Sequence, residues 1–304
     1  MIRKTTLAIQ ISVMILFSSC AAPASQGTPT RTPLLTKTST ILPTGTGDES
    51  TIDTAVLVGD STLAPIIRPI SLVLWGTNFD NGMENFNISI DQSVGCEHFP
   101  IQMSDIDIHT IQDATAPSAN AYVLELIANT SNKGGLFVNA IAHRDIEFIE
   151  DSRYIFEGYF KKVADSKPEQ IDINLQLVQD YNEYYAEIIW TLNPYSPFYN
   201  WIWTRVQDFR PVKLFELQND SKWHYFKLIA EYRSNPTRRY ISTIQVDNQS
   251  IEPNLEMGIV KKEWQSSFTA LLETHNMYTN CDEDLVFVGK SRWDNISVTI
   301  EPVH

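Results

Sequence analysis

A dense run of aromatic rings occupies residues 188–209, IIWTLNPYSPFYNWIWTRVQDF. Sugar rings stack on aromatic faces, and pockets that combine apolar walls with a few polar groups suit such ligands. The Asn-Pro and Ser-Pro pairs within the run indicate a loop, where exposed rings call for a ligand. We therefore predict a ligand-binding set, although half or more of these rings could instead fill a core. Its members are Trp190, Tyr195, Tyr199, Trp201, Trp203 and Arg205, the last three sharing strand parity.

Three carboxylates form a second, weaker set in DIEFIE at residues 145–150. The spacing resembles the Glu-x-Asp-x-x-Glu catalytic strand of laminarinase-like glycoside hydrolases, whose retaining chemistry needs two carboxyl groups about 5–5.5 Å apart. Here Asp145 and Glu147 exchange the expected residue types. Strand parity also turns Glu150 away from Asp145 unless a bulge intervenes. The favoured interpretation is a solvated strand edge, with no catalytic residues assigned.

Composition narrows the remaining classes of function. The 304 residues carry a net charge of −14, and 43% are hydrophobic, which is enough for a packed core. Because nucleic acids and anionic membrane surfaces attract basic patches, neither is expected as a partner. No P-loop, GxGxxG, GxSxG or HExxH pattern occurs, so nucleotide cofactors and α/β-hydrolase chemistry are not expected.

The N-terminus has the layout of a secretory signal: Arg3 and Lys4 precede a short apolar run, and small residues end at Cys20. The run of residues 7–17 is too short to span a bilayer as a helix. Phe-Ser-Ser-Cys resembles the lipobox of bacterial lipoproteins, which implies a lipidated Cys20 and an extracytoplasmic, membrane-anchored protein. Residues 1–19 are the expected signal peptide, and the Thr-, Ser- and Pro-rich residues 20–64 are the expected disordered linker. In an oxidising compartment, Cys96 and Cys281 are expected to form a disulfide.

Residues 65–304 carry strand patterns almost throughout. Apolar residues alternate in short runs bounded by Asn, Gly, Ser, Pro or Asp, and residues 260–275 fit either a helix or a strand. The predicted fold is all-β, a two-sheet antiparallel β-sandwich. The expected strands cover residues 85–90, 121–128, 135–142, 154–160, 172–178, 184–190, 223–232, 240–247, 285–289 and 293–300.

Four segments carry a family resemblance. WHYFKLIAEYR, YISTIQVDNQSI and SRWDNISVTI, together with NFDNGMENFNI near the start, resemble concanavalin A-like jelly rolls of the LamG and laminarinase-like kind. In this resemblance Val246-Asp247-Asn248 is a turn, with Asn248 replacing the usual glycine because Asn tolerates the left-handed backbone. A galactose-binding-like strand order remains an alternative.

The resemblance also implies a structural calcium. Asp80 and Asn81 near the first expected strand would meet Asp294 and Asn295 on the last one, and Ca²⁺ prefers six to eight oxygen ligands. The alternative is that Asp80 and Asn81 only make a turn and Asp294 caps a strand edge. No other cofactor is expected.

The leading hypothesis is a surface lipoprotein whose sandwich binds a ligand, most plausibly a carbohydrate, without catalysis. A glycoside hydrolase or lyase on the same sandwich is the first alternative, and it needs two acidic groups beside the aromatic run. A structural or protein-interaction module of the cell envelope is the second, and there the rings would be buried.

Overall fold

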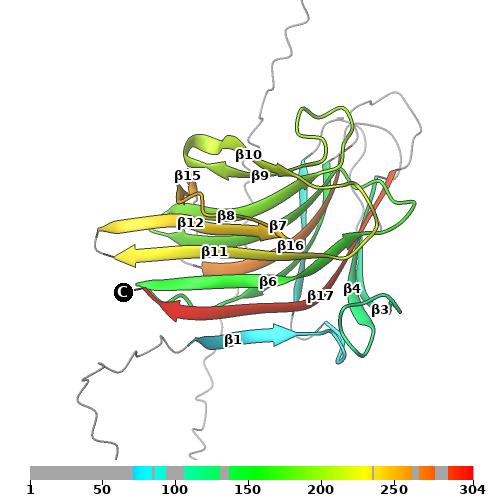
Figure 1. Ribbon diagram of the computed structural model, residues 1–304, viewed down its shortest axis with the longest axis horizontal. Coiled ribbons are helices and arrows are strands. Elements are labelled where there is room, and N and C mark those ends of the chain that lie inside the picture. Colours follow the sequence, from blue (N-terminus) through cyan, green and yellow to red (C-terminus); the bar gives the residue numbers. More distant parts are fainter. Residues whose placement is uncertain are drawn as a thin grey trace, which may run out of the picture. The chain divides into compact units, whose positions relative to one another are not determined.

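The computed structural model describes residues 71–83, 86–93, 106–130, 137–234, 236–261, 267–277 and 287–303. All of them belong to the unit Arg68–His304. The strands of this part of the chain form two antiparallel sheets, and Figure 1 shows them stacked one on the other. The predicted all-β, two-sheet antiparallel sandwich is confirmed by this pairing.

Sheet A has nine strands in the order β13-β12-β11-β6-β17-β4-β3, with β1 paired to β17 and β14 to β12. Its strands are β1 (Leu72–Thr77), β3 (Ile106–Gln112), β4 (Tyr122–Thr130), β6 (Ser152–Lys162), β11 (His224–Ser234), β12 (Thr237–Val246), β13 (Gln249–Ile251), β14 (Leu255–Glu256) and β17 (Phe287–Pro302).

Sheet B has eight strands in the order β10-β9-β8-β7-β16-β5-β2, with β15 paired to β8. Its strands are β2 (Asn87–Ser93), β5 (Phe137–Asp145), β7 (Gln170–Gln179), β8 (Asn182–Thr191), β9 (Trp201–Val206), β10 (Arg210–Glu216), β15 (Gly258–Lys261) and β16 (Ser267–Met277); the 3₁₀ turn η2 (Gln207–Phe209) joins β9 to β10.

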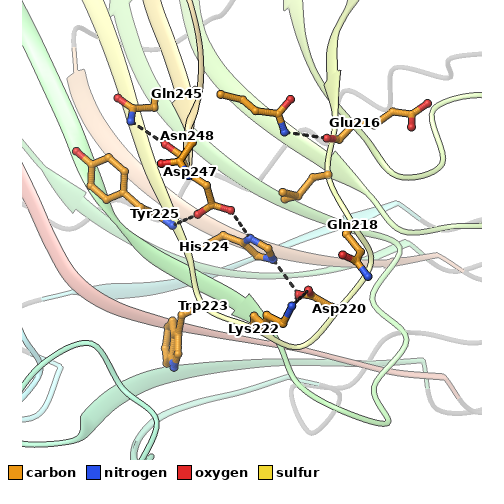
Figure 2. A pocket seen from close by; sticks show the side chains of 12 residues that line it. Glu216, Gln218, Asp220, Lys222, Trp223, His224, Tyr225, Gln245, Asp247 and Asn248 are labelled. Carbon is orange, nitrogen blue, oxygen red and sulfur yellow. Dashed lines mark hydrogen bonds and ion pairs between the residues drawn. The ribbon is translucent and has the colours of Figure 1, made fainter.

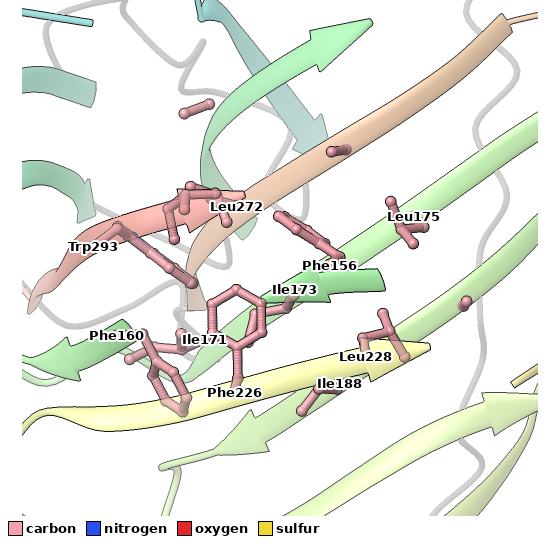
Figure 3. Close-up of a cluster of buried hydrophobic side chains, with 14 of the residues drawn as sticks. Phe156, Phe160, Ile171, Ile173, Leu175, Ile188, Phe226, Leu228, Leu272 and Trp293 are labelled. Carbon is pink, nitrogen blue, oxygen red and sulfur yellow. The ribbon is translucent and has the colours of Figure 1, made fainter. Parts of the chain in front are cut away.

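The hydrophobic core lies between the sheets. On β7, Ile171, Ile173 and Leu175 are buried in it, because alternate residues of a strand face the same side. Phe226 of β11 and Trp293 of β17 meet them from sheet A, as Figure 3 shows. Each sheet therefore has an inner face toward this core and an outer face directed away from it.

Several details differ from the sequence-based expectations. Residues 287–289 of one expected run and the whole run at 293–300 belong to a single strand, β17, whose pairing with β6 shifts register between Asp294 and Ser297. The last strand lies beside β1, which the sequence did not predict, whereas the expected first strand is β2 in sheet B. At the turn after β12 the residue with left-handed backbone is Asp247 (φ 52°) and not Asn248.

Within the stretch 260–275, for which a helix and a strand were both open, residues 267–275 belong to the strand β16 (Ser267–Met277). Within the described ranges, no helix is both long and apolar enough to traverse a lipid bilayer. The central strands β7, β8 and β16 are long and paired on both sides, so they provide a rigid base for the side chains of the outer face of sheet B.

Candidate functional site

A buried polar network lies on the outer face of sheet B. Its residues alternate with the core residues of β5, β7 and β16, so their side chains point away from the core. All five are buried nonetheless, with at most 8% of each residue exposed. We define the polar network as Asn139, Asp172, Asn174, Glu273 and His275.

Glu273 and His275 are at the centre of this network. The Glu273 carboxylate accepts hydrogen bonds from Asn139 Nδ2 at 2.5 Å and from Asn174 Nδ2 at 2.6 Å. His275 Nε2 lies 3.1 Å from Asp172 Oδ2 and 3.3 Å from Glu273 Oε2. Burial alone would lower the pKa of His275, but the two carboxylates outweigh it and raise that pKa to about 10. The imidazole is therefore a cation held between two anions at neutral pH.

The network leaves acceptor oxygens without partners. Because both amide Nδ2 groups of Asn139 and Asn174 donate to Glu273, the orientation of each amide is set by the carboxylate. Their Oδ1 atoms and Asp172 Oδ1 are buried and have no hydrogen-bond partner among the described residues. A buried acceptor without a donor is costly, so these oxygens are suited to bound water, which can in turn contact the hydroxyl groups of a ligand.

A charged pair on β8 and β9 borders the network. Arg205 donates from Nε to Glu187 Oε1 at 2.5 Å and from Nη2 to Oε2 at 2.7 Å, a two-point contact. Burial raises the pKa of Glu187 even though Arg205 opposes it. On the same face, Tyr185 donates its hydroxyl to Glu183. Burial, followed by the charge of Glu183, raises the pKa of Tyr185.

Aromatic rings adjoin the network at one end of the sheet. The rings of Phe198 and Trp203 lie 4.9 Å apart, and Lys213 Nζ lies 4.8 Å from the centre of the Trp201 ring. Trp201 and Trp203 lie on the outer face, because they alternate along β9 with the buried Ile202. We call Phe198, Trp201 and Trp203 the aromatic platform.

The aromatic platform and the polar network are continuous. Trp203 Nε1 donates to Thr191 Oγ1 at 2.8 Å, and Gln170 Nε2 donates to the same oxygen at 3.4 Å. Gln170 is in turn the register partner of His275 on β16. Hydrogen bonds and strand register thus connect the rings to the buried polar groups across four neighbouring strands.

The predicted aromatic set divides between this surface and the core. Trp201, Trp203 and Arg205 lie on the outer face of sheet B, together as their parity predicts. Tyr195 and Tyr199 are exposed in the loop before β9, Tyr195 almost fully (94%). Trp190, in contrast, is fully buried on the inner face of β8, against Phe160 and His224. The prediction that Trp190 contacts a ligand is therefore wrong.

The weak catalytic candidates lie at the opposite end of sheet B. Asp145 pairs with Thr269 at the start of β16, whereas the network residue His275 lies six residues further along that strand. At about 3.3 Å per residue, the separation is roughly 20 Å. Glu147 follows β5 in the connection to β6, and Glu150 forms an ion pair with Arg239 at 2.9 Å. Asp145, Glu147 and Glu150 therefore do not supply the two acids that a hydrolase would need beside the rings.

The expected calcium residues come near one another without forming an evident metal centre. Asp294 is buried and accepts backbone N–H groups of Ser118 at 2.7 Å and Asn295 at 2.8 Å. Burial and, to a smaller extent, the charge of Asp80 raise the pKa of Asp294. One carboxylate oxygen of Asp80 is buried and has no hydrogen-bond partner among the residues that the structure describes, which fits a cation. Across the described ranges, however, no three His, Cys, Asp or Glu side chains gather as metal ligands. Calcium stays a prediction.

The remaining predicted site residues are Asn81 and the three cysteines. Asn81 lies in the turn after β1, beside Asp80. The cysteines Cys20, Cys96 and Cys281 lie outside the described residues, so lipidation and the disulfide also stay predictions.

Sequence reasoning missed the polar network. Asp172 and Asn174 alternate with isoleucine and leucine, which is the usual pattern of a solvated strand face. The available signal was the set of Asp, Asn, Glu and His residues at alternate positions of two long strands, in the runs QIDINLQ (residues 170–176) and LLETH (residues 271–275), which lie about a hundred residues apart in the chain. Their convergence depends on the register of β7 with β16, which pairs Asp172 with Glu273.

Comparisons with known proteins found similar solved structures but no family. No protein-family model matches the sequence, and no curated protein matches it. An endo-β-1,4-glucuronan lyase from the fungus Trichoderma reesei is similar in structure, with a TM-score of 0.43 and 11% identity over 68% of this chain and 94% of that chain.

Two further solved structures are similar at comparable levels. A family 16 carbohydrate-binding module has a TM-score of 0.33 and 11% identity over 75% of this chain and 99% of that one. A pseudo β-1,3-glucanase of Mycobacterium tuberculosis has a TM-score of 0.39 and 11% identity over 76% and 99%. At these scores the likeness carries no argument about ligand or activity, which must come from the chain's own surface.

Proposed function

We propose that this protein binds a carbohydrate chain on the outer face of sheet B and does not transform it. The single observation that supports the proposal is the continuity of the aromatic platform with the polar network, through Trp203, Thr191 and Gln170. Rings suit the apolar C–H faces of sugars, and the adjacent polar groups suit their hydroxyls.

The polar groups have the right chemistry for hydroxyl ligands. Three buried acceptor oxygens, on Asn139, Asp172 and Asn174, have no donor in the described part of the chain, so hydroxyl groups of a ligand would reach them through bridging water. The groups that carry them are held in place by Glu273 and His275, so a ligand would meet an ordered surface and little entropy would be lost in ordering it. Charged groups on this face neutralise one another, as Arg205 does with Glu187.

A polysaccharide hydrolase or lyase is the second candidate, and one observation favours it. Asp172 and Glu273 are register partners on β7 and β16, so their Cβ atoms lie about 4.5–5.5 Å apart. Retaining glycosidases use two carboxyl groups about 5–5.5 Å apart, and here each carboxylate has an oxygen within 3.3 Å of His275 Nε2. His275 lies between these two carboxylates and holds both, which favours binding over catalysis.

Affinity gel electrophoresis of the full chain tests the proposal. Gels would contain, one at a time, β-1,3-glucan, β-1,4-glucan, xylan, mannan and galactan. We expect retardation in at least one of them, reduced about ten-fold in affinity by Trp201→Ala, equivalent to roughly 1.4 kcal/mol. Tyr195→Ala should also weaken binding.

A matched control is available on the same sheet. Tyr181, 68% exposed at the two-residue turn between β7 and β8, lies at the end of sheet B away from the platform. Tyr181→Ala should leave retardation unchanged. Retardation by none of the polysaccharides would refute binding, and release of reducing ends or unsaturated products would select the enzyme alternative.

We also propose that the protein is exported and anchored through Cys20. The basic N-terminus, the short apolar run and Cys20 support this location. Growth of expressing bacteria with an alkyne-tagged fatty acid should label the wild-type protein but not Cys20→Ala. Equal labelling of the two would refute the anchor.

A further inference from the structure

A polar pocket of about 750 Å³ lies beside the aromatic platform, at the end of the strands β10, β11 and β12. The segment between β10 and β11 forms one wall, and the turn between β12 and β13 forms the other (Figure 2). This volume lies within the range of about 300–1,000 Å³ that small-ligand pockets occupy.

The pocket continues from the platform along the backbone. Glu216 of β10, which lines the pocket, is the register partner of Trp201, so the two side chains lie on the same face of sheet B. Three residues later, Asn219 Nδ2 lies 3.4 Å from the hydroxyl of Tyr199. A chain of sugar units lying on Trp201 would therefore reach the mouth of the pocket.

The pocket has a fixed frame. His224, buried at the start of β11, places Nδ1 2.8 Å from Asp247 Oδ2 and Nε2 3.2 Å from Asp220 Oδ1, as Figure 2 shows. One ring thus ties the wall that carries Asp220 to the turn that carries Asp247. Gln249 Nε2 joins the same two walls, donating to the carbonyl oxygen of Glu216 at 3.1 Å. The walls are held before any ligand arrives.

The lining is rich in hydrogen-bonding groups and poor in positive charge. Carboxylates come from Glu216, Asp220 and Asp247, while the basic side chains of the lining are Lys222 and His224. Both basic groups already lie beside Asp220, at 3.3 Å and 3.2 Å. An anionic sugar such as a uronate would therefore find carboxylates and no uncommitted cation in this lining. Hydroxyl groups would find acceptors.

We propose that this pocket is a second subsite, which holds an uncharged sugar unit of the same chain that the platform binds. The proposal rests on the proposed function and adds the place and the charge class of a further unit. Gln218 and Asn248, on opposite walls, are the side chains that would contact it.

A length series of oligosaccharides tests the subsite. The probes are oligomers of two to eight units, cut from the neutral polysaccharide that the full chain binds best, and isothermal titration calorimetry gives their affinities. For the wild-type protein we expect affinity to rise again once the oligomer is long enough to reach the pocket. Gln218→Ala combined with Asn248→Ala should remove most of that gain, about ten-fold, and leave the affinity of the shortest binding oligomer unchanged.

Gln112→Ala is the matched control, because Gln112 is an exposed glutamine on β3 of sheet A. It should keep the wild-type length dependence. If the double variant also keeps it, the subsite is refuted while binding on the platform stands. If no oligomer binds at all, both the subsite and the proposed function are refuted.

The charge class has its own test. The same oligomers, oxidised at C6 to uronates, should bind the wild-type protein at least about ten-fold more weakly at the lengths that reach the pocket. Equal or tighter binding of the oxidised oligomers would overturn the assignment to an uncharged unit.

Discussion

His275→Gln removes the titratable group at the centre of the polar network. In the wild-type protein the carboxylates of Asp172 and Glu273 raise the pKa of His275 to about 10, against an ordinary value of 6.5. The folded protein therefore holds a proton that the unfolded chain releases above pH 6.5. The stabilisation is complete below pH 6.5 and is lost as the pH rises through 10.

The magnitude follows from this window. Between pH 7 and pH 9 the folded protein holds about one proton more on His275 than the unfolded chain does. His275 therefore makes the free energy of unfolding fall by about 1.4 kcal/mol for each pH unit. Over those two units the loss from this group is about 2.7 kcal/mol. His275→Gln keeps a polar side chain but has no such proton, and it leaves two buried carboxylates without their cation. We expect it to be strongly destabilised at pH 6, by roughly 3–5 kcal/mol.

Urea unfolding of the full chain at pH 6, 7, 8 and 9, followed by tryptophan fluorescence, gives these free energies. The difference in free energy of unfolding between wild type and His275→Gln should become smaller as the pH rises. The control is Gln112→Ala, which changes an exposed, non-titrating side chain on β3 and should keep the wild-type slope. Parallel pH curves for wild type and His275→Gln would refute the ion-paired arrangement of the network.

Three other substitutions test the packing and the charges that hold the sandwich. Phe226→Ala should lower the free energy of unfolding by about 3–5 kcal/mol, measured in urea, because the ring is fully buried between the sheets. Gly158→Ala should cost about 1–3 kcal/mol in the same assay, since the new Cβ would lie 3.1 Å from the carbonyl oxygen of Asn295; a melting temperature equal to wild type would contradict that contact. Burial alone would raise the pKa of Asp113, but Lys161 and other donors lower it, so its stabilisation is present above pH 4 and lost in acid. Asp113→Asn should therefore be less stable at pH 7 and lose less stability on acidification, as thermal melts at pH 7 and pH 3 would show.

Most strands could be predicted from alternation alone. On β7 the isoleucines and leucine at odd positions and the polar residues at even ones indicate a strand with one buried face, and that is what the structure has. The joined strand β17 could not be predicted. Its register shift between Asp294 and Ser297 lies against Gly158 of β6, so it depends on a residue far away in the sequence.

The aromatic residues show where the pattern is ambiguous. On β9 the neighbouring polar residues Thr204 and Arg205 lie on opposite faces, so they do not indicate which face is the inner one. The parity of Trp201 and Trp203 correctly predicts that these two rings share a face. On β8 the apolar Ile188, Ile189 and Trp190 follow one another, so nothing local assigns Trp190 to the core. That assignment depends on contacts with sheet A.

The polar network could not be predicted from the sequence for a different reason. Each of its members, taken singly, is an ordinary polar residue on a strand. Only the antiparallel register of β16 with β5 and β7 brings Asn139, Glu273 and Asn174 within hydrogen-bonding distance. Sequence spacing along one chain carries no information on such a register until the strand order is known.

Fluorine NMR of the full chain labelled with 5-fluorotryptophan measures the ligand surface most directly. The protein has seven tryptophans, and single substitutions assign each resonance. On addition of the polysaccharide that retards the protein, the resonances of Trp201 and Trp203 should shift, while those of Trp190 and Trp293, fully buried in the core, should stay in place. Unchanged Trp201 and Trp203 resonances with the polysaccharide bound would contradict a ligand surface on the outer face of sheet B.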